Sequence, residues 1–577
     1  MTGTPFALDQ GAATACPVLI QNQYNPHLVN PAPQSATVRP PSAHHEQVVR
    51  LFRHLHGAAV TDLRDLTDPA DRAPALLQAV AAGAPIIVGA VLPTDWEGHR
   101  RGTADLLIRG EDVIRADGTP GPVYHPVVIK DRSVLAASPP GYASPPIASF
   151  AKPALRDARP TDLRYRADTC SYALFELAHL WYVLAAAGFA DPQPWGGVIG
   201  TDAAPLIRPG AIAWIDLTVR QLRTYSYTSR HPWHRYSPLQ RYDHEHRFRV
   251  RVATRALASG DGTAEGDAGP VASPVSIPQC DRCDWQTVCW TESTDDLSHR
   301  IARAPLDPRE ILTLRGLGVR TVGDLATADV DGLLPDYLPL VAHRDGAESR
   351  LRIAAHRSRL IATGDVLERL TTGPIDLPSA PVEIDLDVEA SARNRVYLWG
   401  FLVTDRREPA SDPTYHAVYR FSPLTVIGER DLAEEAATWL KDFVESLDGV
   451  PALVWHYSSY EPAVLRRLAR PQRSRAPSGL TWAKAWAADH FVDLLPIVKA
   501  NLFGVDGLGL KEVARVGADF EWRDPTPGGL ESQTWFAAAT GARDPEVRLE
   551  SQARILRYNE DDVRATAALR AWLRSLT

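Results

Sequence analysis

Residues 382–389 read Val-Glu-Ile-Asp-Leu-Asp-Val-Glu and alternate without a break between apolar and acidic side chains. A period of two predicts a β-strand whose apolar residues face a core. On the other face, successive carboxylates would lie about 7 Å apart, which is unfavourable unless cations or water neutralise them. Hard divalent ions bound through oxygen meet that need. A solvated edge strand with an acidic outer face is the alternative.

The segment 549–575 is predicted to be a helix that brings another acidic group to this strand. Tyr558 and Asp562 are four residues apart and therefore share a helical face. The same stripe carries Ile555, Leu569, Leu573 and Leu576, which should face the core. A carboxylate that points inward needs a partner, and a metal site supplies one. The alternative is that Asp562 lies at the edge of the stripe beside an arginine.

Together these segments resemble the DEDD exonuclease superfamily, which has a ribonuclease-H-like fold. The first family motif, Asp-x-Glu on a strand, matches Asp387 and Glu389, and the last, Tyr-x-x-x-Asp on a late helix, matches Tyr558 and Asp562. In the middle motif Glu461 stands where the family has aspartate. Asp493 is a second candidate for that position, although a strand-end residue explains it more simply.

The resemblance implies two Mg²⁺ or Mn²⁺ ions roughly 4 Å apart that clamp the scissile phosphate. Asp387, Glu389 and Asp562 would hold one ion, and Asp387 would bridge to the second. Glu461 is the candidate ligand for that second position. Tyr558 would orient the attacking water. The implied activity is a 3′–5′ exonuclease.

The cysteines point to a second metal site. Cys280, Cys283 and Cys289 form a Cys-x2-Cys-x5-Cys cluster, and such clusters in a large, apparently cytosolic chain indicate metal ligands before disulfides. Three thiolates leave a tetrahedral site incomplete, so Cys16 or Cys170 would supply the fourth. Cys170 stands at the entry to an apolar helix, where a buried structural cysteine is the simpler interpretation.

An early cysteine and a late Cys-x2-Cys-x5-Cys resemble the iron–sulfur nucleases of the RecB-like family. This resemblance implies a [4Fe–4S] cluster held by Cys16, Cys280, Cys283 and Cys289. Zinc bound by the same four thiolates is the main alternative, and a chance group of free thiols is another.

The nuclease motifs of this PD-(D/E)xK family can be followed between the cysteines. They match His45-Glu46 on a helix, Asp105 in a Gly-x-x-Asp strand, Lys130 at the end of the next strand, and Glu176 where the family has glutamine. The resemblance implies that Asp105 binds Mg²⁺ and that Lys130 orients the water or balances charge. However, Val128 occupies the acidic position two residues before the lysine.

One metal ligand is therefore missing from the N-terminal centre. Glu46, Glu176 or Asp131 could compensate, although strand alternation turns Asp131 away from Lys130. We expect a retained fold in which cleavage is weakened or lost.

These patterns predict an α/β multidomain chain. Residues 1–295 would form a restriction-endonuclease-like α/β module, residues 296–375 a small helical region, and residues 376–577 a ribonuclease-H-like α/β domain. Within the helical region, residues 312–326 resemble a helix–hairpin–helix element. Its backbone N–H groups around Gly316 and Gly318 would cradle a phosphate. A glycine-capped αα-hairpin is an equal alternative.

Residues 231–255 interleave aromatic side chains with Arg and His. An amphipathic helix with a solvated charged face is the favoured interpretation. A basic surface along which single-stranded nucleic acid runs is the alternative.

Composition leaves nucleic-acid binding open. The chain has 577 residues, a net charge of −8 and a pI near 6.1, and an acidic nuclease can still grip phosphates through local basic patches. No secretory signal or membrane span is recognisable, so a cytoplasmic location is expected. No Walker A motif occurs, so any unwinding would need a separate helicase as partner.

The sequence thus predicts a metal-dependent nuclease acting on single-stranded or frayed DNA, with RNA left open as substrate. The alternative is a nucleic-acid-binding scaffold of a repair or defence complex, in which both nuclease centres are degenerate.

Overall fold

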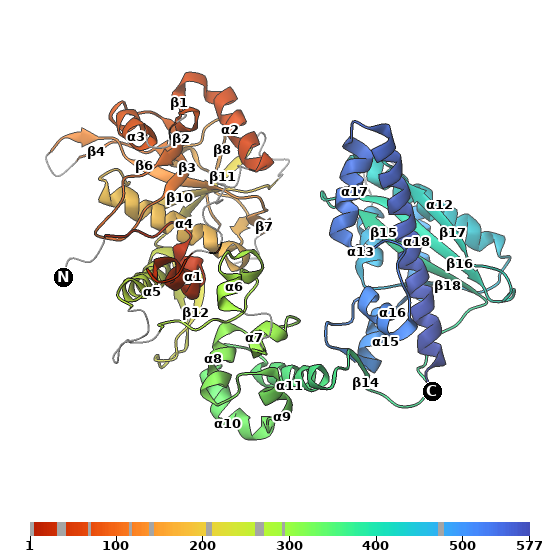
Figure 1. Cartoon of the computed structure of the whole chain (residues 1–577). Helices are drawn as coiled ribbons and strands as arrows, with labels where there is room; N and C mark the ends of the chain where they lie inside the picture. Colours follow the sequence, from red (N-terminus) through yellow and green to blue (C-terminus); the bar gives the residue numbers. More distant parts are fainter. Residues whose placement is uncertain are drawn as a thin grey trace. The chain divides into compact units, whose positions relative to one another are not determined.

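The computed structural model describes residues 5–29, 31, 42–66, 68, 71–114, 118–137, 144–202, 210–259, 270–290, 295–470 and 478–577. The chain divides into two compact units, Met1–Thr294 and Asp295–Thr577, and each has its own sheet and core (Figure 1). No helix in the described segments has both the length and the hydropathy needed to cross a bilayer.

The first unit contains a seven-stranded mixed sheet. In spatial order its strands are β1 (Val60–Asp62), β2 (Ile86–Val91), β3 (Thr103–Arg109), β6 (Tyr124–Ile129), β10 (Trp195–Ile199), β11 (Ala211–Asp216) and β8 (Ile147–Ser149). Its central strands are apolar on both sides because helices cover both faces. Phe52 of α2 (Ala43–His56) shares a buried cluster with Leu106, whereas Leu177 of α4 (Ala167–Ala186) packs with Leu107 on the opposite face.

Several smaller elements complete this unit. They are α1 (Pro17–Tyr24), α3 (Arg72–Ala81), α5 (Pro238–Leu257), α6 (Gln286–Cys289) and three two-stranded sheets: β4 (Val113–Ile114) with β5 (Pro120–Gly121), β7 (Leu135–Ala137) with β9 (Leu163–Tyr165), and β12 (Leu222–Tyr225) with β13 (Trp233–Tyr236).

The amphipathic helix expected over 231–255 begins only at Pro238. Ser237 caps it in a capping box with Gln240, and the residues before the cap form a strand instead.

The second unit begins with five helices: α7 (Leu297–Arg300), α8 (Pro308–Gly316), α9 (Val322–Thr327), α10 (Val330–Leu340) and α11 (Ala347–Thr363). The turn between α8 and α9 favours the capped αα-hairpin over the phosphate cradle. The amide of Gly318 donates to the Arg315 carbonyl, and those of Arg320 and Thr321 donate to the Asp324 carboxylate. The amides that would hold a phosphate already have partners within the chain.

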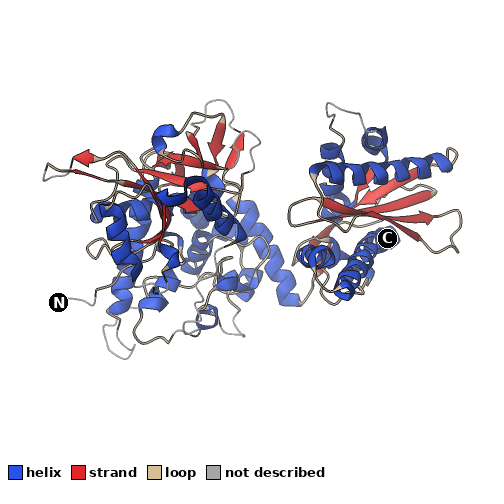
Figure 2. Ribbon diagram, turned by 90° about the horizontal axis from the view of Figure 1, so that it is seen from above, coloured by secondary structure: helices blue, strands red, loops and turns tan. Residues whose placement is uncertain are grey.

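A five-stranded sheet forms the core of the rest of this unit, with helices on both sides of it (Figure 2). Its spatial order is β17 (Thr414–Tyr419), β16 (Val396–Asp405), β15 (Val382–Ala390), β18 (Ala452–His456) and β19 (Phe491–Asp493). β15 is antiparallel to β16 and parallel to β18, and β18 is parallel to β19.

The two faces of β15 meet different helices. Its apolar side chains pack with α12 (Val426–Ser446), α13 (Tyr460–Leu468) and α14 (Ser478–His490). The opposite face of the sheet is covered by α16 (Leu510–Ala518), α17 (Gly529–Gly541) and the long α18 (Pro545–Ser575). Between these helices run α15 (Leu494–Asn501) and β20 (Leu502–Gly504), which pairs with β14 (Leu367–Arg369). The acidic face of β15 is therefore buried beneath α18.

Candidate active site

The helix α18 places a different charge opposite each half of the acidic strand. Arg574 pairs with Glu383 at 2.9 Å, and Arg570 pairs with the fully buried Asp385 and, at 3.1 Å, with Glu383. Two helical turns before Arg570, the same face of the helix carries Asp562. Half of the strand is thus neutralised by arginine, and the other half faces another carboxylate.

Asp387, Glu389 and Asp562 converge in the structure. One carboxylate oxygen from each lies within 4.8 Å of the others, and Glu389 and Asp562 are only 6% and 7% exposed. Within the described residues, this is the group of three or more His, Cys, Asp or Glu side chains that could hold a metal ion. The alternative in which Asp562 sits at the edge of its stripe beside an arginine does not match this burial.

In the triad, burial and mutual repulsion raise the pKa values of the carboxyl groups more than the nearby Lys511 lowers them. Burial, followed by repulsion from Asp562 and Glu389, raises the pKa of Asp387 well above its usual value. Burial and Asp562 raise the pKa of Glu389 to about 8. Burial also raises the pKa of Asp562, against the opposing effect of Lys511. A divalent cation among these oxygens would reverse the cost of ionising them.

Neutral donors hold the three carboxylates in place. Glu389 accepts a hydrogen bond from Ser532 Oγ (2.5 Å), Asp387 from Asn559 Nδ2 (2.8 Å) and Asp562 from Trp522 Nε1 (2.7 Å). A further layer fixes two of the donors, because Tyr397 contacts Ser532 at 2.9 Å and Tyr415 donates to Asn559 at 2.8 Å. None of these donors was predicted from the sequence.

Tyr558 lies beside Asp562 and belongs to the same network. Lys511 Nζ donates to its phenol oxygen at 2.5 Å and lies 4.0 Å from Asp562 Oδ1. The Tyr558 hydroxyl in turn hydrogen-bonds the Asp562 carboxylate. Lysine, phenol and carboxylate therefore form one chain, and its lysine was not identified from the sequence.

Glu461 lies close to the triad but outside its tightest group. It is in the first turn of α13, just after β18, and is 4% exposed. Its negative charge contributes to the raised pKa of Asp387, and burial raises its own pKa to about 8. Among the described residues, its Oε2 atom has no hydrogen-bond partner. Asp493 instead caps α15 by accepting from the Leu495 amide, as expected of a strand-end residue.

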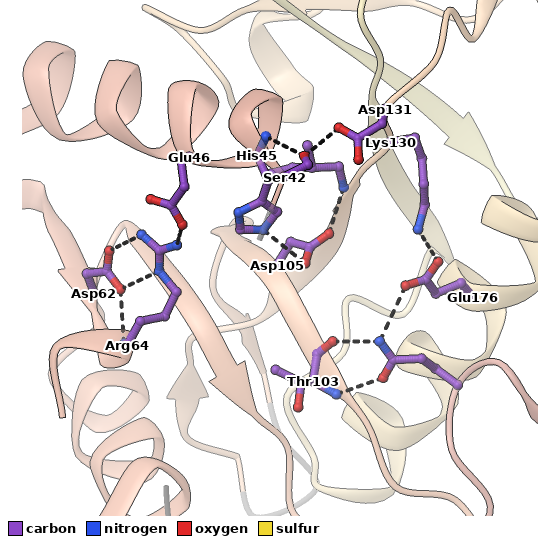
Figure 3. Close-up of polar contacts among 12 residues, drawn as sticks. Ser42, His45, Glu46, Asp62, Arg64, Thr103, Asp105, Lys130, Asp131 and Glu176 are labelled. Carbon is purple, nitrogen blue, oxygen red and sulfur yellow. Dashed lines mark hydrogen bonds and ion pairs between the residues drawn. The ribbon is translucent and has the colours of Figure 1, made fainter. Parts of the chain in front are cut away.

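The residues predicted for the N-terminal centre lie around the ends of β3 and β6 (Figure 3). Asp105 accepts a hydrogen bond from the Ile129 amide at 2.7 Å and lies 3.3 Å from His45 Nε2. Val128 adjoins the Leu106–Val127 pair of the ladder, is fully buried, and packs in the apolar cluster beneath α4. It fills the position from which the second acid would have reached Asp105.

The three candidates for compensation are each engaged elsewhere (Figure 3). Glu46 pairs with Arg64 at 2.9 Å, Glu176 pairs with Lys130, and Asp131 accepts from Ser42 Oγ at 2.5 Å. In the part of the chain that the structure describes, no group of three metal-binding side chains includes Asp105. The structure therefore brings Lys130 to Glu176 and His45 to Asp105, but gathers no further carboxylate around Asp105.

Cys16, Cys280, Cys283 and Cys289 line one cavity of about 280 Å³ in the first unit. Burial and the three neighbouring thiols raise the pKa of Cys289 to about 11, and burial and nearby thiols also raise that of Cys283. In the described segments no three of these sulfurs lie within 4.8 Å of one another. The four thiols therefore line the same cavity, but their sulfur atoms do not converge on one point.

Polar groups from the protein also reach these sulfurs. Asn22 Nδ2 donates to Cys289 Sγ at 3.7 Å, and the Ile277 amide donates to Cys280 Sγ at 3.5 Å. Cys170 does not line this cavity. It is fully buried in the main apolar cluster, and its thiol donates to the Ser133 carbonyl, as expected of a structural cysteine.

Comparison with known proteins bears on the C-terminal site alone. A solved structure described as "Structure of the foamy viral protease-reverse transcriptase dRH in complex with ds DNA" aligns over 73% of this chain and 69% of that chain. Its identity of 10% and TM-score of 0.12 are too low to carry an argument. No curated protein matches the chain. Residues 385–574, which contain Asp387, Glu389 and Asp562, match the family model of the RNase_H superfamily. The C-terminal domain is therefore RNase H-like, and this likeness supports a nuclease-type function in nucleic-acid processing.

Proposed function

We propose that this chain is a metal-dependent nuclease that acts as a 3′–5′ exonuclease on single-stranded or frayed DNA. The observation that carries the proposal is the triad of Asp387, Glu389 and Asp562, whose oxygens converge and of which Glu389 and Asp562 are buried. The RNase H-like match over the same residues supports a nucleic acid as the substrate class.

The donor set fits Mg²⁺ or Mn²⁺, which prefer carboxylate oxygens. Asp387, Glu389 and Asp562 would hold one ion, and Asp387 would share a second with Glu461, whose Oε2 atom has no hydrogen-bond partner among the described residues and lies 3.7 Å from His456 Nδ1. When bound, such ions would stabilise the negative charge on the attacking and leaving oxygens of the phosphodiester.

The surrounding side chains would position the reactants. Tyr558 would orient the attacking water, and the hydrogen bond from Lys511 to its oxygen keeps the phenol beside Asp562. Ser532 and Asn559 each occupy one oxygen of a triad carboxylate, which fixes the direction in which the other oxygen points.

In the same proposal the N-terminal unit is a RecB-like module without cleavage of its own, because Val128 replaces an acid and Glu176 is paired with Lys130. We propose that its four-cysteine cavity holds a [4Fe–4S] cluster. Zinc bound by the same four thiolates is the alternative. That the four thiols line one cavity supports a shared metal group.

The decisive experiment compares two matched aspartate variants on end-labelled single strands with Mn²⁺. Asp387→Ala should lower the rate by at least about a hundredfold, whereas Asp105→Ala should stay within about twofold of the parent. A 3′ label should appear in mononucleotides before a 5′ label does. If the Asp387→Ala protein digests the strand as fast as the parent, the proposal fails.

A second candidate function is a nucleic-acid-binding scaffold that would work with a separate helicase. Val128 and the replacement of aspartate by Glu461 favour it, because each departs from the pattern of an active centre. It predicts DNA affinity without any metal-dependent product. Processive release of label by a clean preparation would exclude it.

A further inference from the structure

The hairpin formed by β12 and β13 has a composition unlike the rest of the chain. Residues 220–236 include four arginines, two histidines and four aromatic residues, but no Asp or Glu, whereas the chain as a whole has a net charge of −8. The hairpin forms a two-stranded sheet of its own, outside the seven-stranded sheet of the first unit. A small element thus carries a locally basic and aromatic surface.

The hairpin packs on its unit through the face that carries Leu222. Leu222, 7% exposed, packs into the main apolar cluster of the first unit. In the antiparallel register Arg223 lies opposite Arg235, and Tyr225 lies opposite Trp233. Because directly opposed residues share a face and successive residues alternate, these four side chains occupy the face away from Leu222.

The outward face is an ordered row of rings and guanidinium groups. The Arg223 guanidinium lies 3.6 Å from the centre of the Trp233 ring, and Tyr225 meets that ring edge-on at 5.0 Å. Tyr227 continues the row, 4.7 Å from Tyr225. Trp233 and Tyr227 are 38% and 37% exposed.

The register of the hairpin places two like charges directly opposite each other. Like charges placed directly opposite each other on a ribbon repel, as Arg223 and Arg235 do here. Within the described residues, none of the hairpin's four arginines forms an ion pair with a carboxylate. An anion that bridges the opposed guanidinium groups would relieve this repulsion.

The spacing of rings and cations suits a single strand. Such a strand offers unpaired bases that can stack on aromatic rings and phosphates that arginines can bind, whereas a duplex keeps its base faces stacked internally. We propose that the outer face of the β12–β13 hairpin binds single-stranded DNA, with bases stacked on Trp233 and Tyr227 and phosphates bound by Arg223 and Arg235. The choice of DNA rests on the proposed function; the site itself lies outside the proposed catalytic centre.

The test measures binding without cleavage. The full chain carrying Asp387→Ala is titrated against dye-labelled single-stranded oligothymidylate in a chelating buffer, and the dissociation constant is followed as salt is varied. Trp233→Ala should weaken binding about tenfold, since stacking on one ring is worth about 1–3 kcal/mol. Trp233→Phe should retain most of the affinity.

The arginines should be visible in the salt dependence. The double variant Arg223→Ala/Arg235→Ala should reduce the slope of log affinity against log salt by about 1.4, because each phosphate contact on a single strand contributes about 0.7. The matched controls are Trp96→Ala, whose ring is 59% exposed elsewhere in the unit, and Arg156→Ala/Arg255→Ala, two arginines outside the hairpin. They should leave both the affinity and the slope unchanged.

Three outcomes would overturn the inference. One is affinity within twofold of the controls for both the Trp233→Ala and the double-arginine proteins, with melting temperatures equal to the parent's. The others are tighter binding of a duplex or of oligouridylate than of the DNA strand. Because no metal is present, a failure of the nuclease assignment would leave this measurement intact, and the reverse also holds.

Discussion

Lys511 Nζ lies 2.5 Å from the phenol oxygen of Tyr558 and 4.0 Å from a carboxylate oxygen of Asp562, so one ammonium group serves two predicted active-site residues. It also lowers the pKa values of Asp387, Glu389 and Asp562, against the larger effect of burial. Among the described residues it is the cation that acts on all three triad carboxyls. Removal of the Lys511 ammonium group should therefore change the pKa values of the triad, and a variant that keeps the length of the side chain can separate this effect from a loss of packing.

Lys511→Met should shift the acid limb of the pH–rate profile to higher pH. Without the ammonium group the triad carboxyls would have still higher pKa values, so a higher pH is needed before they ionise and bind the metal. We expect a shift of about one pH unit and a fall in rate of about tenfold near neutrality. Lys511→Arg, which keeps the charge, should retain the parental acid limb. An unchanged limb in Lys511→Met would contradict this role.

The metal-free protein should lose stability as pH rises from about 4.5 to about 8. In the unfolded chain Glu389 ionises near the ordinary glutamate pKa of 4.5, whereas burial and Asp562 raise its folded pKa to about 8. Between these values the folded state binds more protons than the unfolded state, so its free energy of unfolding falls with increasing pH. Mn²⁺ should reverse the fall, because it binds the ionised carboxylates of the folded state.

The variant Asp387→Asn tests the cost of ionising the triad carboxyls by removing one of them. In chelating buffer near pH 8 it should raise the melting temperature by about 2–4 °C, which corresponds to about 1 kcal/mol, because it removes a carboxyl group whose ionisation is opposed by burial and by its acidic neighbours. It should also abolish the stabilisation by Mn²⁺. Asp442→Asn, on α12 and away from the triad, is the control and should change neither quantity. A destabilised Asp387→Asn protein would mean that the triad is not under electrostatic strain.

Much of the C-terminal site could be predicted from the sequence, because its acidic residues lie in two segments with a clear strand or helix periodicity. The alternation over 382–389 places four carboxylates on one face, and the spacing of Tyr558 and Asp562 brings a fifth to meet them. The alternation could not show which of the four are free. Arg570 and Arg574, which neutralise half of the strand, lie more than 180 residues away in the sequence.

The residues that the sequence did not reveal share one property: they are chemically ordinary until the chain folds. Ser532, Asn559 and Trp522 belong to no motif, and only tertiary contact turns them into carboxylate partners. One secondary-structure prediction was also wrong at its boundary. The helical prediction over 231–255 runs through Ser237, where the cap and the following proline mark the true start of α5.

Cys289→Ser should remove the metal from the first unit if the four cysteines hold a cluster. Anaerobically purified parent protein should be brown and contain about four irons per chain, and the variant should be colourless. Cys170→Ser, which changes a thiol outside the cavity, should keep the colour. Stoichiometric zinc in a colourless parent protein would replace the cluster with a structural zinc site.

Arg570→Met should cost about 3–5 kcal/mol of unfolding free energy, measured by chemical denaturation. The reason is that Asp385 is fully buried and its pKa is about 6 even with Arg570 beside it, so the variant would leave an uncompensated charge in the core. At lower pH the loss of unfolding free energy caused by Arg570→Met should be smaller, because the carboxyl of Asp385 can then be protonated.

The control for this prediction is Arg564→Met, which removes another arginine of α18. Arg564 pairs with Glu560 across one turn of the same helix, and this partly exposed pair should contribute less than about 1 kcal/mol. The double variant Asp385→Asn/Arg570→Met should recover part of the loss, because the charge and its partner disappear together. If Arg570→Met proved no more harmful than Arg564→Met, the arginines would not be neutralising the first half of β15. The contrast with the second half of the strand, where Asp387 and Glu389 face another carboxylate, would then disappear.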